Sequence, residues 1–191
     1  MSRISTYPID TVVDTADLLI GTDSEDQNIT KNYTIASIIS LAASATSGGY
    51  INAAVTVGAT TVTPIAEVST FYFLEGTLIP SVSNLWAVGT GDDVNKIIYS
   101  GTASQVTSII STVNIEGTMN NVINIALFKN DIEIAGTRQT TRIPSVVVPA
   151  PVCLQTIDTV LAGDVISVKV MNTLYSNDVT ATHYNISATL V

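Results

Sequence analysis

The chain has 191 residues, of which 46% are hydrophobic and only 12% charged, and its formal net charge at pH 7 is −9. Because an acidic surface repels the phosphates of nucleic acids and anionic membranes, neither is an expected partner. No uninterrupted apolar run approaches the roughly 20 residues that a membrane-spanning helix needs, so no membrane insertion is expected. The apolar residues must therefore be buried in a core or between copies of the chain, and the composition allows both a well-filled monomer and an obligate oligomer.

The first 45 or so residues are more acidic than the rest of the chain. A short extended segment is predicted near Ile4–Ile9, and a second short strand at Leu18–Ile20. A polar turn is predicted from Gly21 to Asn28. The N-terminal sequence MSRISTYPID has no apolar signal region, so no secretory signal is expected.

One helix is predicted after this turn, with Thr34 as its N-cap. Its apolar side chains recur at positions i, i+3, i+4 and i+7, which are Ile35, Ile38, Ile39 and Ala42. A helix of about ten residues is marginal alone, so this stripe should dock on a partner surface. The sequence SATSGG at 44–49 is typical of a linker. We therefore expect an N-terminal module at 1–47 and a second domain at 48–191.

The second domain is predicted to be mainly β, because short apolar runs alternate with turn residues throughout it. The predicted strands are Ile51–Val57, Thr61–Ile65, Ser69–Leu74, Leu85–Gly89, Lys96–Ser100, Thr107–Ile115, Asn121–Lys129, Ile132–Ala135, Ser145–Val148, Val152–Ile157, Val165–Met171 and Val179–Leu190. Asn130 and Asp131 tolerate positive φ and predict a tight hairpin between Lys129 and Ile132. In the last strand, Tyr184 and every second residue after it should face the core, and His183 the opposite side.

The sequences NKIIYSG (95–101), INIALFKNDIEI (123–134) and VLAGDVISVKVMN (160–172), followed by a closing strand, resemble the jelly roll of the tumour-necrosis-factor and complement globular-head family. The version found at the tips and knobs of bacteriophage fibres is especially similar. The N-terminal stretch 16–39 is similar to short leader modules that attach phage fibres to the particle. The resemblance implies an antiparallel jelly-roll sandwich that assembles as a homotrimer.

The residues indicate no enzymatic chemistry, metal or cofactor. His183 is the single histidine and is interpreted as a surface or interface residue. Cys153 lies in an apolar context and is interpreted as a small core residue. The acidic groups at Asp23–Asn28 and Asp92–Asp93 are interpreted as solvated turns. Asp164 is expected to bond the backbone of its own turn.

The leading hypothesis is a non-enzymatic structural protein of a bacteriophage virion, assembled in the host cytoplasm. The N-terminal module would bind capsid or tail proteins, and the jelly roll would project as a homotrimeric knob. The alternative is a receptor- or carbohydrate-binding module at a fibre tip, which could bind a host surface glycan. Its candidate aromatic residues are Tyr175, Trp86 and Tyr99, and its candidate loop, 174–178, includes Tyr175, Asn177 and Asp178.

Overall fold

The structure is a computed structural model that describes residues 18–23, 29–36, 48–56, 58–144 and 148–191. The chain divides into two compact units, Met1–Ser47 and Gly48–Val191. In the first unit, strand β1 (Leu18–Asp23) pairs antiparallel with strand β2 (Ile29–Thr34).

Only part of the N-terminal prediction falls on described residues. Ile35 and Ala36 follow β2 and are helical, whereas the remainder of the predicted helix and the segment Ile4–Ile9 lie outside the described residues. The predicted polar turn is wrong at Gly21–Asp23, because β1 continues through these residues in register with β2.

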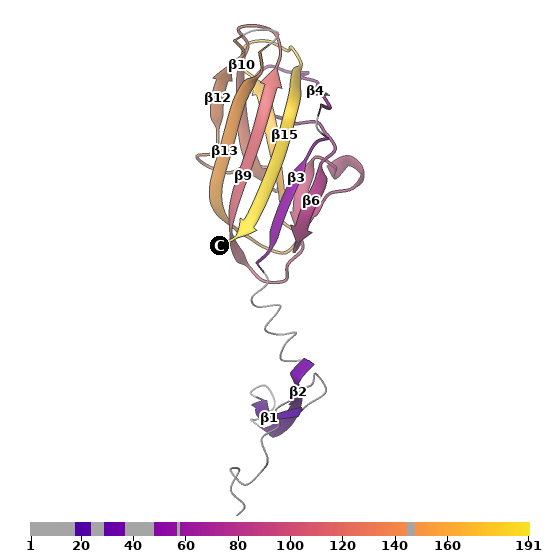
Figure 1. Cartoon of the computed structure of the whole chain (residues 1–191). Helices are drawn as coiled ribbons and strands as arrows, with labels where there is room; N and C mark the ends of the chain where they lie inside the picture. The colour runs from indigo at the N-terminus through magenta and orange to yellow at the C-terminus, as the bar shows by residue number, and fades with distance from the viewer. Residues whose placement is uncertain (1–17, 24–28, 37–47, 57, 145–147) are drawn as a thin grey trace, which may run out of the picture. The chain divides into compact units, whose positions relative to one another are not determined.

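The second unit is a sandwich of two antiparallel sheets (Figure 1). The six-stranded sheet has the order β13-β9-β15-β3-β6, with β4 paired to β15. Its strands are β13 (Ala150–Val160), β9 (Gln105–Glu116), β15 (Val179–Leu190), β3 (Tyr50–Ala54), β6 (Ile79–Asn84) and β4 (Thr61–Thr63).

The seven-stranded sheet has the order β11-β10-β14-β8-β7, with β12 paired to β10 and β5 paired to β14. Its strands are β11 (Ile132–Glu133), β10 (Val122–Lys129), β14 (Val165–Asn172), β8 (Lys96–Tyr99), β7 (Trp86–Val88), β12 (Gln139–Arg142) and β5 (Tyr72–Phe73). A single 3-10 turn is described in the second unit, at Gly91–Asp93.

The long strands change sheet at each step along the chain, from β8 to β9 to β10 and from β13 to β14 to β15. This alternation places strands that are distant in sequence side by side, and it defines a jelly roll. The prediction of a mainly β, antiparallel jelly-roll sandwich is confirmed.

The core lies between the two sheets because the inward residues of each strand are apolar. In β15, Tyr184, Ile186 and Ala188 are buried, while His183 is exposed, as predicted. The Tyr184 hydroxyl donates a hydrogen bond of 3.1 Å to the backbone carbonyl of Asn95, and burial raises the pKa of Tyr184 above its ordinary value.

The predicted hairpin after β10 is confirmed. Asn130 and Asp131 have φ values of 49° and 67°, and Lys129 pairs with Ile132 across the turn. Two consecutive residues with positive φ give the hairpin a twist that matches its strands.

Two strands of the second unit, β6 and β12, were not predicted, and both have mostly exposed side chains. The predicted strand Ser145–Val148 falls largely outside the described residues, and Val148 lies in a bend. The described part of the chain contains no helix that is long and apolar enough to cross a membrane.

Candidate assembly interface

The outer side of the seven-stranded sheet is covered by its own chain. Met171 and Phe128 point away from the core, yet they are only 7% and 6% exposed. The ring of Phe71 packs edge-on against Phe128 with 5.0 Å between the ring centroids. The Lys169 ammonium group lies 4.1 Å from the ring centroid of Phe73 and 4.7 Å from that of Phe128. Loop aromatics and lysine stems therefore shield this sheet from water.

The charged side chains of the second unit are distributed unequally between the two sheets. The strands of the seven-stranded sheet carry four cations and the residue before β12 a fifth: Lys96, Lys129, Arg142, Lys169 and Arg138. The strands of the six-stranded sheet contain no lysine or arginine, and their acidic residues are Glu116 and Asp158. The six-stranded sheet is thus nearly free of charge.

Figure 1 shows β13, β9, β15 and β3 side by side in the six-stranded sheet. Their register places the outward side chains in rows across these strands. Opposed residues of antiparallel strands lie on the same side of the sheet. Three central rows consist of uncharged side chains, and we call this surface the open face: Cys153, Thr112, Asn185; Gln155, Ile110, Ser187, Asn52; and Ile157, Ser108, Thr189, Tyr50.

Several polar side chains of the open face bond to other side chains or to the sheet backbone. The Asn185 Nδ2 donates to Asn52 Oδ1 at 2.6 Å, and the Ser187 Oγ donates to the Ile110 carbonyl at 3.4 Å. The Thr112 Oγ1 lies 3.4 Å from His183 Nε2. Because burying an unbonded polar group is costly, these internal bonds lower the cost of covering the open face.

Apolar side chains on the open face are left uncovered. Ile157 is 68% exposed, Tyr50 44% and Ile110 40%. A shallow hollow of about 260 Å³ lies between β9 and β13, lined by Ser108, Ile110, Gln155, Thr156 and Ile157. The open face therefore combines exposed apolar groups with uncharged polar groups, and depletion of charge is a feature of interface cores.

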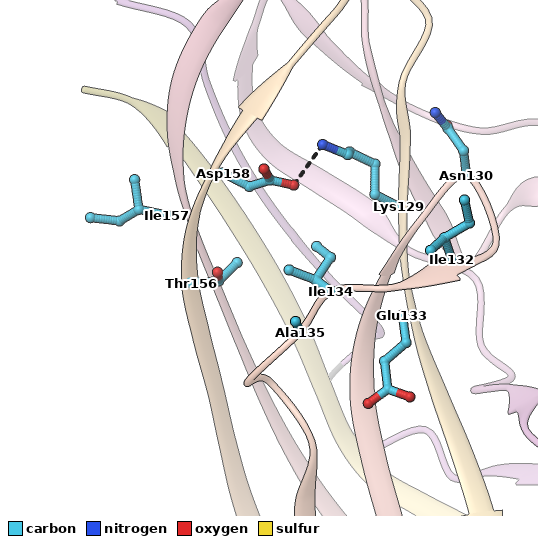
Figure 2. A pocket seen from close by; sticks show the side chains of 9 residues that line it. All are labelled: Lys129, Asn130, Ile132, Glu133, Ile134, Ala135, Thr156, Ile157 and Asp158. Atoms are coloured by element: carbon cyan, nitrogen blue, oxygen red, sulfur yellow. Dashed lines mark ion pairs between the residues drawn. The ribbon is translucent and has the colours of Figure 1, made fainter.

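A second hollow adjoins the open face at the β13 edge, and we call it the side groove. It has a volume of about 450 Å³ and is lined by Lys129, Asn130, Ile132, Glu133, Ile134, Ala135, Thr156, Ile157 and Asp158. Figure 2 shows Asp158 facing Lys129 across the groove, with Ile157 on the other side of β13. The two charges form an ion pair at 2.6 Å, so the groove presents an apolar floor beside a neutralised pair.

The loop at 174–178 was predicted as a possible ligand loop, and the structure gives it a defined conformation. The Asn172 Oδ1 accepts from the backbone N–H groups of Leu174 and Tyr175, both at 3.2 Å. The Asn172 Nδ2 donates to the Asn177 carbonyl at 3.3 Å, and the backbone N–H of Ile65 donates to Asp178 Oδ1 at 3.1 Å. Tyr175 is 54% exposed at the loop surface.

The other two candidate aromatic residues, Trp86 and Tyr99, are buried and do not lie on the loop that carries Tyr175. Trp86 is 3% exposed and Tyr99 is 1% exposed, and their rings pack together at 5.1 Å between centroids. Both are core residues, so neither presents a ring to a ligand.

Cys153 was predicted to be a core residue, and this is wrong. Its neighbours Val152 and Leu154 are buried, so the alternation of β13 directs Cys153 outward, where it is exposed. Asp164 lies in its turn as predicted, since its Oδ2 accepts from the Leu161 N–H at 2.8 Å. It also accepts a bond from the Asn130 amide.

Of the predicted helix residues, Ile35 is half-buried, and Ile38, Ile39 and Ala42 lie outside the described residues. Among the side chains that the structure describes, no group of three or more His, Cys, Asp and Glu residues is placed to bind a metal ion.

The fold thus defines an antiparallel jelly-roll protein with one open sheet face. No family model and no curated protein sequence matches this chain. Among solved structures, that of murine APRIL at pH 8.0 is 12% identical with a TM-score of 0.47, covering 75% of this chain and 99% of that chain. The PRD1 vertex protein P5 is 12% identical with a TM-score of 0.42, covering 75% of this chain and 96% of that chain.

Proposed function

We propose that the chain is a non-enzymatic structural protein of a bacteriophage particle, a homotrimeric short fibre or capsid or tail appendage. Residues 1–47 attach it to the particle, and residues 48–191 form the projecting jelly-roll knob. The observation that carries the self-association is the contrast between the two sheets: one is covered by its own chain and bears the cations, and the other presents the open face.

Burial between copies accounts for the chemistry of the open face. Desolvating an unpaired charge costs several kcal/mol, whereas apolar area removed from water contributes roughly 25 cal/mol per Å². Covering a face whose central rows are uncharged avoids the cost of desolvating a charge. Its exposed apolar side chains would still contribute the free energy of burial. The resemblance of 95–191 to trimeric jelly rolls supports three copies as the stoichiometry.

The small sheet described in the N-terminal unit supports its proposed role in attachment. A two-stranded sheet is marginally stable alone in water, and β1 and β2 pair only with each other among the described residues. Docking on a capsid or tail protein, by strand addition at β1 or β2 and by the predicted stripe at Ile35, Ile38, Ile39 and Ala42, would add stabilising contacts.

Attachment is tested by producing virions whose chain begins at Gly48. The truncated chain keeps the whole jelly-roll core and should assemble as the full chain does, yet be absent from purified particles. A full-length chain produced in parallel is the control for copy number. Particles that carry the truncated chain at the full-length copy number would contradict the attachment role.

A receptor- or carbohydrate-binding role is a second candidate, favoured by the ordered loop that displays Tyr175. An exposed aromatic ring on a preorganised loop can stack on a sugar ring at little entropic cost. The carbohydrate-binding role would be supported if the protein binds a glycan array, if Tyr175→Ala abolishes this binding, and if Met119→Ala, a control at another exposed position, leaves it unchanged. An array that shows no binding would contradict the carbohydrate-binding role and would leave the structural role as the remaining candidate.

A further inference from the structure

Strand β3 is the first strand of the jelly roll, directly after the point where the chain enters the second unit at Gly48. It lies inside the six-stranded sheet between β15 and β6, so it has a partner along both edges. Its register extends from Tyr50 to Ala54 against both neighbours. Ile51 and Ala53 point into the core, where they are buried. A strand with two partners and one buried side is held along its whole length.

The chain is also held at the two residues before β3. The Gly48 carbonyl accepts from the Asn84 Nδ2 at 3.3 Å, and the Gly49 carbonyl accepts from the Leu190 N–H at 2.8 Å. A Cβ atom at Gly49 would lie 2.7 Å from Leu190 Cδ1, so glycine lets the chain pass this close to β15 without displacing Leu190. The entering chain is therefore bonded to the ends of β6 and β15.

β3 and β15 lie side by side and run in opposite directions (Figure 1). Thr189 pairs with Tyr50 at the end of the sheet where the chain enters, whereas β15 begins with Val179 at the far end. The loop that displays Tyr175 leads directly into this far end. A load applied between Gly48 and Tyr175 thus pulls β3 and β15 by their N-terminal ends, in opposite directions along their axes.

This direction loads the pair of strands in shear. Hydrogen bonds of an antiparallel pair are perpendicular to the strands, so a pull along the strands strains all of them together. A pull between Gly48 and Val191 acts instead on neighbouring ends of β3 and β15, and it separates the bonds one after another. We expect β3 to yield first in shear, because β15 pairs with β9 along Thr180–Leu190 but with β3 only along Asn185–Thr189.

We propose that residues 48–54, together with β6 and the 185–190 part of β15, form a mechanical clasp that carries load in shear between the attachment unit and the distal loops. This inference rests on the proposed function, because attachment through residues 1–47 places tension on Gly48 whenever the knob is held at its far end. A first strand at a sheet edge would be held by one row of bonds, whereas β3 has two.

Side-chain bonds reinforce the clasp on both sides of β3. The Asn185 Nδ2 of β15 donates to Asn52 Oδ1 at 2.6 Å. The Ser81 Oγ of β6 donates to the Asn52 carbonyl at 3.0 Å. Asn52 at the centre of β3 is therefore linked to both neighbouring strands beyond the ladder itself.

Single-molecule force spectroscopy on the full-length chain tests the clasp in two pulling directions. Gly48→Cys supplies the handle at the entry, where an added Cβ atom has nothing within 4 Å. Tyr175→Cys or Val191→Cys supplies the second handle at an exposed position, and Cys153→Ser removes the native exposed thiol. Labelled chains are diluted into unlabelled chains so that an assembly carries one pair of handles. At a matched loading rate, the rupture force between 48 and 175 should be several-fold higher than that between 48 and 191.

Two core variants locate the resistance. Ile51→Ala removes a buried side chain of β3, and Ile123→Ala removes a similarly buried one of β10 in the other sheet. Both should make unfolding by denaturant easier, because each leaves a cavity in the core. Only Ile51→Ala should lower the rupture force between 48 and 175, since forced unfolding is governed by the barrier at the element that yields first.

Equal rupture forces in the two directions would overturn the clasp, and so would an Ile123→Ala protein whose rupture force between 48 and 175 falls as far as that of Ile51→Ala. Neither readout depends on virions or on the number of chains in the assembly. Failure of the proposed attachment would be seen separately, in particles that carry the chain beginning at Gly48.

Discussion

Asn130 links two turns, and its replacement by alanine is a quantitative test of the fold. Its Nδ2 donates to Asp164 Oδ1 at 2.7 Å, and its Oδ1 accepts from the Val165 N–H at 2.9 Å. Its φ of 49° is in the left-handed region, which asparagine tolerates better than alanine. The side chain therefore holds the hairpin after β10 against the turn before β14.

The magnitude follows from these three contributions. A bond to a carboxylate is worth about 1.5–3 kcal/mol and a neutral one about 1 kcal/mol. The left-handed backbone costs alanine about 1 kcal/mol more. Asn130→Ala should thus lower the free energy of unfolding by about 3.5–5 kcal/mol, and Asn130→Gly, which loses the bonds without the strain, by about 1 kcal/mol less.

The assay is denaturant unfolding followed by the fluorescence of Trp86, the single tryptophan, which is buried. All variants are compared at one protein concentration, because assembly couples stability to concentration. A loss below about 1 kcal/mol for Asn130→Ala would refute the linking role. Equal losses for the alanine and glycine variants would refute the backbone contribution.

Three further predictions concern other parts of the jelly roll. Burial raises the pKa of Tyr184 above its ordinary value of 10, so with rising pH the unfolded chain loses the phenol proton before the folded chain does. Above about pH 10 the free energy of unfolding should therefore fall, by up to ~1.4 kcal/mol per pH unit. Tyr184→Phe should remove this contribution to the pH dependence. Cys153 on the open face should react slowly with a thiol reagent in the assembled protein and rapidly in a monomeric open-face variant; equal rates would exclude it from the interface. Phe73→Leu removes the ring that lies 4.0 Å from the Lys96 ammonium and 4.1 Å from that of Lys169, so unfolding should become easier by about 1–2 kcal/mol with no change in assembled mass. A dissociated Phe73→Leu protein would place the covered sheet at the interface.

The long strands could be predicted because each has a continuous row of mainly apolar side chains facing the core. The predicted strand Val179–Leu190 has the bounds of β15, and the predictions for β10 and β14 differ from the structure by one residue. Alternation is produced by a core on one side and a more exposed surface on the other, so it appears in β15, whereas β10 and β14 bury residues on both sides.

The missed strands lack that signal. β6 is exposed along almost its whole length and contains Pro80, which an edge strand tolerates. It pairs with β3 at the edge of the sheet without a row of buried apolar side chains that the sequence could reveal. Cys153 shows a related error. Its neighbours in the sequence are apolar, but side chains alternate between the two sides of β13, and Cys153 falls on the outer side.

The open face and side groove could not be found in the sequence, because each joins strands that are far apart along the chain. Gln155, Ile110, Ser187 and Asn52 form one row only once the order of β13, β9, β15 and β3 is known. The exclusion of Trp86 and Tyr99 as ligand residues also required the packed core.

The most direct test of the central claim, self-assembly through the open face, is the absolute solution mass of the full-length protein by light scattering. The account predicts a mass three times that of the 20.1 kDa chain, and a fall to the mass of a single chain when Ser187→Lys charges the open face. A wild-type protein with the mass of one chain, or a Ser187→Lys protein that keeps the wild-type mass, would contradict it.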